Sequence, residues 1–187
     1  MKKFGHVLDE NCGGDEILGG YPRRIVIIPT CAIKTYPVRE SSPQELNDIC
    51  KHTGTFEFND ERQPPIVVDV IPGSVNYKAE PQGEVGSESF KPNGSFRMKD
   101  SREADGLAKY VTNTPCVIVI PEHNEKEQFF VGSKNLPCKI TANFESGTKA
   151  ADTRGYTFNF EVEGSFFPKQ YLASPMDIDA LAEESDD

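Results

Sequence analysis

The residues best suited to chemistry in this chain of 187 amino acids are two histidines and two cysteines, His6, Cys12, Cys50 and His52. Imidazole and thiolate are the ligands that zinc prefers, and four of them close a tetrahedral site. The spacing does not match such a site, because Cys50 and His52 lie two positions apart and no second pair follows. We therefore interpret these residues as core thiols and surface histidines, and expect no metal and no cofactor.

Catalytic groups are equally hard to find in the sequence. A nucleophilic Cys–His pair would need a third group to orient the base, and none is marked. Carboxylates occur in pairs at Asp177 and Asp179 and at Glu183 and Glu184, but acids in a charged tail are usually solvated. No glycine-rich loop has the spacing that binds phosphates. We expect that the chain is not an enzyme. A hydrolase whose acidic residues are dispersed along the chain remains a competing hypothesis.

Composition limits the class of protein further. The chain has 30 acidic and 20 basic residues and a formal net charge of -10, which opposes tight binding to a phosphate backbone but allows DNA to slide past. Five cysteines without framework spacing do not predict a disulfide scaffold. Of these, Cys31, Cys116 and Cys138 lie in apolar stretches and are expected in the core. We expect no membrane segment and no signal peptide, because no apolar run is long enough.

Several short apolar or alternating segments predict strands. They lie at 24–32, 55–58, 66–71, 74–80, 96–98, 116–120, 128–131, 138–145 and 156–163. Residues 81–95 are rich in Gly, Ser, Pro and Glu and are interpreted as a long loop. Residues 1–20 are polar, with two Gly-Gly pairs, and are interpreted as an extended arm. The expected division is an arm at 1–20, a β domain at 21–172 and an acidic extension at 173–187.

Helix signals are fewer. Ser42, followed by Pro43 and Glu45, predicts a helix of two to three turns with Leu46, Ile49 and Cys50 on one face.

A second capping box at 100–103 precedes a stripe of Ala104, Leu107, Ala108 and Val111, which predicts a helix of about three turns. Ser174 is expected to cap a short helix near the C-terminus. The predicted fold is mainly β, a β-sandwich or open barrel with one flanking α-helix, an N-terminal arm and a short C-terminal helix.

The most regular pattern is a pair of strands at 138–145 and 156–163. The inward faces should carry Cys138, Ile140, Ala142 and Phe144, and Tyr156, Phe158, Phe160 and Val162. The outward faces should carry Lys139, Thr141, Asn143 and Glu145, and Thr157, Asn159, Glu161 and Glu163. The connection at 146–155 is either a plain hairpin loop or a loop that projects towards a neighbouring subunit.

The run FESGTKAADTRGYTFNFEVEG, followed by FFPKQYL, resembles the C-terminal end of phage tail tube proteins, also called major tail proteins. The shared features are a strand, a loop rich in Gly, Ala and Asp, a strand start of the form RG-aromatic, and a closing P-x-x-Y. This resemblance covers about a fifth of the chain. The proline-rich residues 60–95 match nothing in that family.

The resemblance implies a structural protein of the virion tail, made in the host cytoplasm, whose copies form stacked homo-oligomeric rings, usually hexamers, around DNA that passes without tight binding. Other tail or neck proteins would be partners, and a membrane would not. The residues facing the channel would be Glu145, Thr157, Asn159, Glu161 and Glu163. Intersubunit contacts would involve Phe166, Phe167 and Tyr171, for which packing within one subunit is an open alternative.

Two other functions remain open on the sequence. A ring adaptor of the phage neck or tail terminus would share the architecture. A monomeric β-sandwich module would instead bind a protein or carbohydrate partner through the edge formed by residues 81–95.

Overall fold

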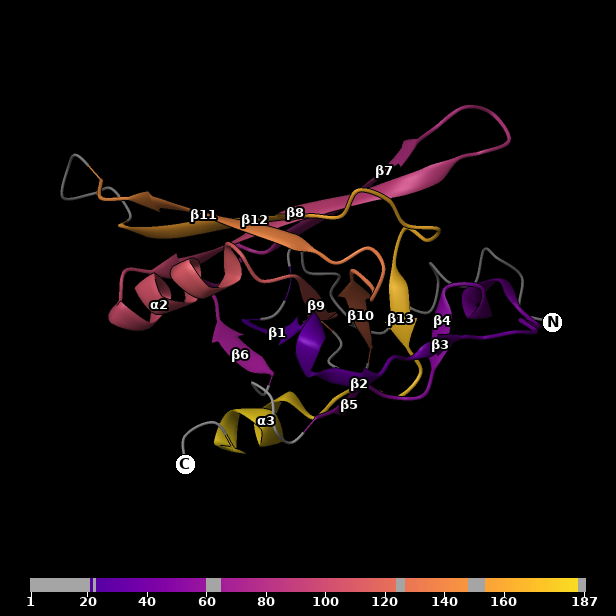
Figure 1. Cartoon of the computed structure of the whole chain (residues 1–187), viewed down its shortest axis with the longest axis horizontal. Coiled ribbons are helices and arrows are strands. Elements are labelled where there is room, and N and C mark those ends of the chain that lie inside the picture. The colour runs from indigo at the N-terminus through magenta and orange to yellow at the C-terminus, as the bar shows by residue number, and fades with distance from the viewer. Residues whose placement is uncertain (1–20, 22, 60–64, 124–126, 148–153, 185–187) are drawn as a thin grey trace, which may run out of the picture.

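The computed structural model describes residues 21, 23–59, 65–123, 127–147 and 154–184. They form a mainly β fold of three sheets with a flanking helix and a short helix near the C-terminus (Figure 1). The predicted fold class is confirmed, while the expected arm at 1–20 lies outside the described residues.

The large sheet has seven strands in the order β3-β4-β13-β10-β9-β1-β6. Their bounds are β3 (Val38–Arg39), β4 (Lys51–Thr53), β13 (Gln170–Leu172), β10 (Gln128–Val131), β9 (Cys116–Pro121), β1 (Arg24–Pro29) and β6 (Ile66–Asp69). All pairs are antiparallel except β13 with β4. The central strands β1 and β9 are continuously apolar because both faces of this sheet are covered.

The small sheet has four antiparallel strands in the order β11-β12-β8-β7. Their bounds are β11 (Lys139–Glu145), β12 (Gly155–Glu161), β8 (Ser89–Lys99) and β7 (Asn76–Gln82). The inner face is aromatic, and Phe96 stacks on Phe158 with ring centroids 4.8 Å apart. The outer face is polar, so each strand alternates as a half-buried strand should.

The inner faces of the two sheets enclose the main core together with helix α2 (Arg102–Val111). A second core lies on the other face of the large sheet. It is covered by a two-stranded sheet, β2 (Ile33–Thr35) with β5 (Glu57–Phe58), and by Met176 and Ile178 before and in helix α3 (Ile178–Glu184). In Figure 1 the small sheet lies above α2 and the large sheet, and α3 lies below.

Helix α2 buries the stripe that was predicted, Ala104, Leu107, Ala108 and Val111. Its cap is Ser101, whose Oγ accepts a hydrogen bond from the Ala104 amide at 3.1 Å. The capping residue is thus one position later than a capping box at 100–103 implied.

The helix predicted after Ser42 is wrong. A single 3₁₀ turn, η3 (Leu46–Asp48), forms instead, and the chain then enters β4. Leu46 is 61% exposed, so no core is available to bury the apolar stripe that the helix would have carried. A helix of two to three turns is marginal without such burial, whereas β4 gains pairing with β3 and β13.

The long loop predicted at 81–95 is also wrong, because β7 and β8 occupy most of it. The turn between them is short, and the Ser87 amide donates to the Glu84 carbonyl at 2.9 Å. Gly94 is required in β8, since a Cβ there would lie 2.2 Å from the Asn76 carbonyl oxygen and 2.5 Å from the Phe160 ring. The polar composition of residues 81–95 indicated a loop, but it reflects the solvent-exposed outer face of this hairpin.

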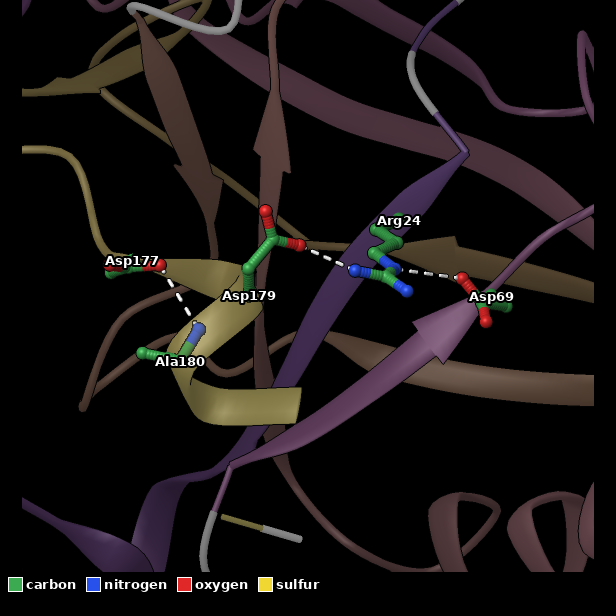
Figure 2. A network of polar contacts seen from close by, with 5 residues as sticks. All are labelled: Arg24, Asp69, Asp177, Asp179 and Ala180. Atoms are coloured by element: carbon green, nitrogen blue, oxygen red, sulfur yellow. Dashed lines mark hydrogen bonds and ion pairs between the residues drawn. The ribbon is translucent and has the colours of Figure 1, made fainter. Parts of the chain in front are cut away.

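Two smaller predictions also need correction. Cys116 and Cys138 are buried as predicted, but Cys31 is exposed. The last helix begins at Ile178 rather than after Ser174, with Asp177 Oδ1 accepting from the Ala180 amide at 3.0 Å (Figure 2). The preceding residues stay extended because the Gln128 side chain bonds both the carbonyl and the amide of Met176, at 2.8 and 2.9 Å.

Candidate assembly surface

The outer face of the small sheet gathers the residues that the sequence placed outward on its last two strands. Glu145, Thr157, Asn159 and Glu161 lie on this face by strand register, and Glu163 is exposed just beyond the end of β12. The same register adds residues of β7 and β8 that the sequence reading had assigned partly to a loop. All four strands therefore contribute to one polar surface.

The charges on this surface are balanced rather than acidic. The strand register places five basic residues on it, Lys78, Lys91, Arg97, Lys99 and Lys139. The acidic residues are four, Glu80, Glu145, Glu161 and Glu163. One of the acids is paired with one of the bases, since Lys91 Nζ lies 3.7 Å from Glu161 Oε2. In a chain with a net charge of -10, this face is relatively basic.

The small sheet has two long edge strands, β7 and β11, whose outer sides are open. β7 and β11 have seven residues each, and no described strand pairs with their outer sides. The antiparallel ladder turns the backbone groups of Ile140, Ala142 and Phe144 towards the open side of β11. Such edges are templates for pairing with another chain.

The aromatic residues predicted at subunit contacts lie in different environments. Phe166 is 85% exposed. Phe167 packs against His52, with ring centroids 5.6 Å apart, and beneath the Arg39 guanidinium at 5.0 Å. Tyr171 packs on Phe129 in the main core, as in the alternative of packing within one subunit. Of the three, Phe166 is presented outward.

A half-buried lysine lies where the large sheet meets the small sheet, and the sequence analysis did not find it. Lys169 Nζ lies 2.5 Å from Glu122 Oε1 and over the rings of Phe129, Tyr21 and Tyr171, at 4.6, 5.4 and 5.8 Å. Burial opposes the charge, but the hydrogen bond and the charge of Glu122 outweigh it and raise the pKa of Lys169.

Tyr77 completes this cluster from the small sheet. Its hydroxyl donates to the Pro168 carbonyl, its ring lies 4.9 Å from that of Phe129, and burial raises its pKa. No sequence signal connects Glu122 with Lys169, because they are 47 positions apart. The cluster fixes the segment that carries Phe166 and Phe167.

The described histidine and cysteine that were considered as metal ligands or nucleophiles are packed within the fold. His52 packs edge-on against Phe130 and its Nδ1 lies 3.3 Å from the Cys50 carbonyl oxygen. Burial lowers the pKa of His52 and raises that of the Cys50 thiol. Burial also raises the pKa of Cys116 to about 12, which makes it a poor nucleophile. His6 and Cys12 lie outside the described residues.

Asp177 and Asp179, the paired acids near the C-terminus, make structural contacts. Asp177 caps α3, while Asp179 pairs with Arg24, whose Nε also lies 3.1 Å from Asp69 Oδ1 (Figure 2). Within the described ranges no three His, Cys, Asp or Glu side chains are placed to hold a metal ion. Among the helices described, none has the length and apolar character needed to cross a membrane.

Comparisons of the chain with protein-family models, with curated proteins and with solved structures found no match.

Proposed function

We propose that this protein is a structural subunit whose copies join through the small sheet into closed rings, as in the tail tube of a phage. The observation that carries the proposal is a four-stranded sheet with one polar outer face and a free seven-residue strand at each edge. The resemblance of residues 144–172 to phage tail tube proteins agrees with it.

Pairing of β7 of one copy with β11 of the next would continue the small sheet from subunit to subunit. Closure of such a chain removes every free edge, which is the usual advantage of a ring or barrel. The covered large sheet would then lie outside and the polar face inside. Hexamers that stack into a tube are the form that the resemblance implies.

The balanced charge of the outer face suits a channel through which DNA passes. A strongly basic lining would neutralise phosphates and hold the DNA, and a strongly acidic lining would raise the barrier to entry. Five basic and four acidic residues on the face give little net attraction or repulsion. Glu145, Thr157, Asn159, Glu161 and Glu163 would face the lumen beside the five basic residues.

A monomeric partner-binding module is the second candidate, because an apolar groove lies beside the exposed Phe166. A neck or tail-terminator adaptor is a variant of the first, and would give single rings instead of stacked ones. The mass of the assembled protein separates these functions.

The experiment targets the free edge of β11. Ala142→Pro removes an amide that faces the open side, at an edge position where proline is tolerated. Asn143→Ala in the same strand is the matched control, because it changes a side chain on the wet face and keeps the backbone donors.

We expect light scattering to show rings for the wild type and the control, and a folded monomer for Ala142→Pro. Circular dichroism confirms that the variant is folded. Rings of unchanged mass in a folded Ala142→Pro protein would contradict assembly through this edge.

A further inference from the structure

The turn that joins β7 and β8 presents an apolar side chain at its apex. Val85 is 97% exposed at the second position of a β-turn closed by the Ser87 amide and the Glu84 carbonyl. Gly86 at the third position has a φ of 94°, as a turn of this type requires. Polar residues or proline usually occupy the position of Val85, and valine there buries nothing within its own subunit.

The turn is ordered by its own contacts and stands at the end of a hairpin that extends beyond the rest of the sheet (Figure 1). Gly83 has a φ of 107°, and a Cβ there would lie 2.7 Å from the Ser87 carbonyl oxygen. The closing hydrogen bond and the two glycines favour one backbone conformation for this turn, which lowers the entropy lost on contact.

An apolar groove of about 820 Å³ lies between β4, the segment after β10 and the segment before β13. Three exposed apolar residues line it, Ile49, Leu136 and Phe166, at 36%, 41% and 85% exposure. Exposed Val38 adjoins the lining residue Arg39, and exposed Leu46 bonds through its carbonyl to the amide of Ile49. Five of the seven large hydrophobic residues exposed in the described part of the chain thus gather at this end of the molecule.

Charge favours one occupant of the groove. The charged residue of the lining is Arg39, and the exposed residues that interrupt the lining segments carry opposite charges, Lys134 and Glu163. The turn carries Glu84 and Glu88, both exposed, and no basic residue between them. An acidic tip is repelled by most of a chain with a net charge of -10, so a groove whose lining carries the cation Arg39 and no anion is a selective target.

We propose that the turn at 83–88 of one copy docks into this groove on a second copy, with Val85 against Ile49, Leu136 and Phe166 and with Glu84 and Glu88 towards Arg39. Turn and groove are different surfaces, so the contact is heterologous and each copy can both give a turn and receive one. The contact uses none of the free edge of β11 and does not require closed rings.

Photo-crosslinking tests the contact directly. The full chain with Ala142→Pro, which removes pairing through the β11 edge, is made with a photoreactive phenylalanine analogue at position 85, and a second version of it carries the analogue at position 144. Phe144 is also exposed and apolar, but the strand register places it near the end of the small sheet opposite the turn. We expect adducts between two copies from position 85 that map to residues 46–50, 132–136 or 163–168, well above those from position 144. Adducts that map elsewhere, or a yield equal to that of the control, would overturn the proposal.

Variants measure its strength in the Ala142→Pro background, where pairing through the β11 edge is removed. Val85→Ser and Phe166→Ser change exposed side chains and leave the fold intact. Each should weaken association by roughly tenfold, as expected for one buried apolar side chain. Glu84→Lys should weaken it as well, and Arg39→Glu should restore it in the double variant.

Unchanged association of the Val85→Ser protein would sink the proposal. Rings that persist in the Ala142→Pro protein would contradict the proposed function while the crosslink from position 85 still stood, so the two failures are distinguishable.

Discussion

The two main sheets of this protein differ in what covers them. The central strands of the large sheet are buried on both faces, by the main core on one side and by the second core with its β2–β5 cover on the other. The small sheet has one covered face, and its other face is polar and exposed. Burial on two faces stabilises a fold, while a wet face with free edges leaves room for contact with other molecules. We infer that the large sheet stabilises the fold and that the small sheet makes the contacts with other molecules.

The largest expected effect comes from disturbing the small sheet from within. Gly94→Ala would place a Cβ 2.2 Å from the Asn76 carbonyl oxygen and 2.5 Å from the Phe160 ring. Because backbone and core must both move, we expect a loss of about 3 kcal/mol or more in the free energy of unfolding, measured by urea denaturation.

Gly106→Ala in α2 is the control for this change, since a Cβ there meets nothing within 4 Å. It should stabilise the protein by up to about 1 kcal/mol through helix propensity. Equal effects of the two substitutions would mean that the close approach of β7 and β8 is not as described.

A smaller effect is expected where the two sheets are joined. Lys169→Ala leaves Glu122 without its cation and removes the contact with Phe129, so it should cost about 1–3 kcal/mol by denaturation. Lys169→Met keeps the packing and removes the charge, and should lie between the wild type and the alanine variant. A loss with methionine as large as with alanine would assign the effect to the ion pair alone.

The pH dependence of the large sheet offers a finer test. Burial lowers the pKa of His52 from 6.5, so the folded state binds fewer protons than the unfolded state below that value. Stability contributed by neutral His52 is therefore complete above pH 6.5 and is lost as the pH falls towards the lowered pKa.

The measurement is the midpoint of thermal unfolding at several pH values between about 7.5 and about 5. The wild type should lose more stability than His52→Gln over this interval. Parallel curves for the two proteins would show that another group is responsible.

The smallest effect is expected at the cover of the second core. Arg24 joins Asp69 of β6 to Asp179 of α3 on an exposed surface (Figure 2). Exposed ion pairs contribute little and are screened by salt. Arg24→Gln should therefore speed proteolysis after residue 173 at low salt and match the wild type at high salt. A difference that persists at high salt would point to a role of Arg24 beyond charge.

Sequence patterns were sufficient where one face or both faces of a segment are apolar. The strands near 116–120, 128–131, 138–145 and 156–163 and helix α2 follow from periodicity, because the core that they bury is the core that the pattern describes.

Alternation predicted strands at 74–80 and 96–98, but the end of β7 and most of β8 could not be predicted in the same way. The sequence of this hairpin is rich in Gly, Pro and charge because its outer face is wet and its turn is exposed. The η3 region failed for the opposite reason, since good local capping signals had no surface on which to bury Leu46. Both cases show tertiary context overriding local preference.

Only the part of the candidate surface on β11 and β12 could be predicted from the sequence. Alternation placed Glu145, Thr157, Asn159 and Glu161 on one face, but the basic residues of β7 and β8 needed the strand register. The groove beside Phe166 joins segments from residue 39 to residue 170, and no local pattern connects them.

The central claim is that copies of the chain close into rings with the small sheet inside. Electron microscopy of the purified protein over a concentration series, with mass from light scattering, tests it most directly. We predict rings with a central hole whose mass is an integral multiple of 20.8 kDa, and stacking at higher concentration. A monomer of 20.8 kDa at every concentration would contradict the claim and favour the partner-binding module.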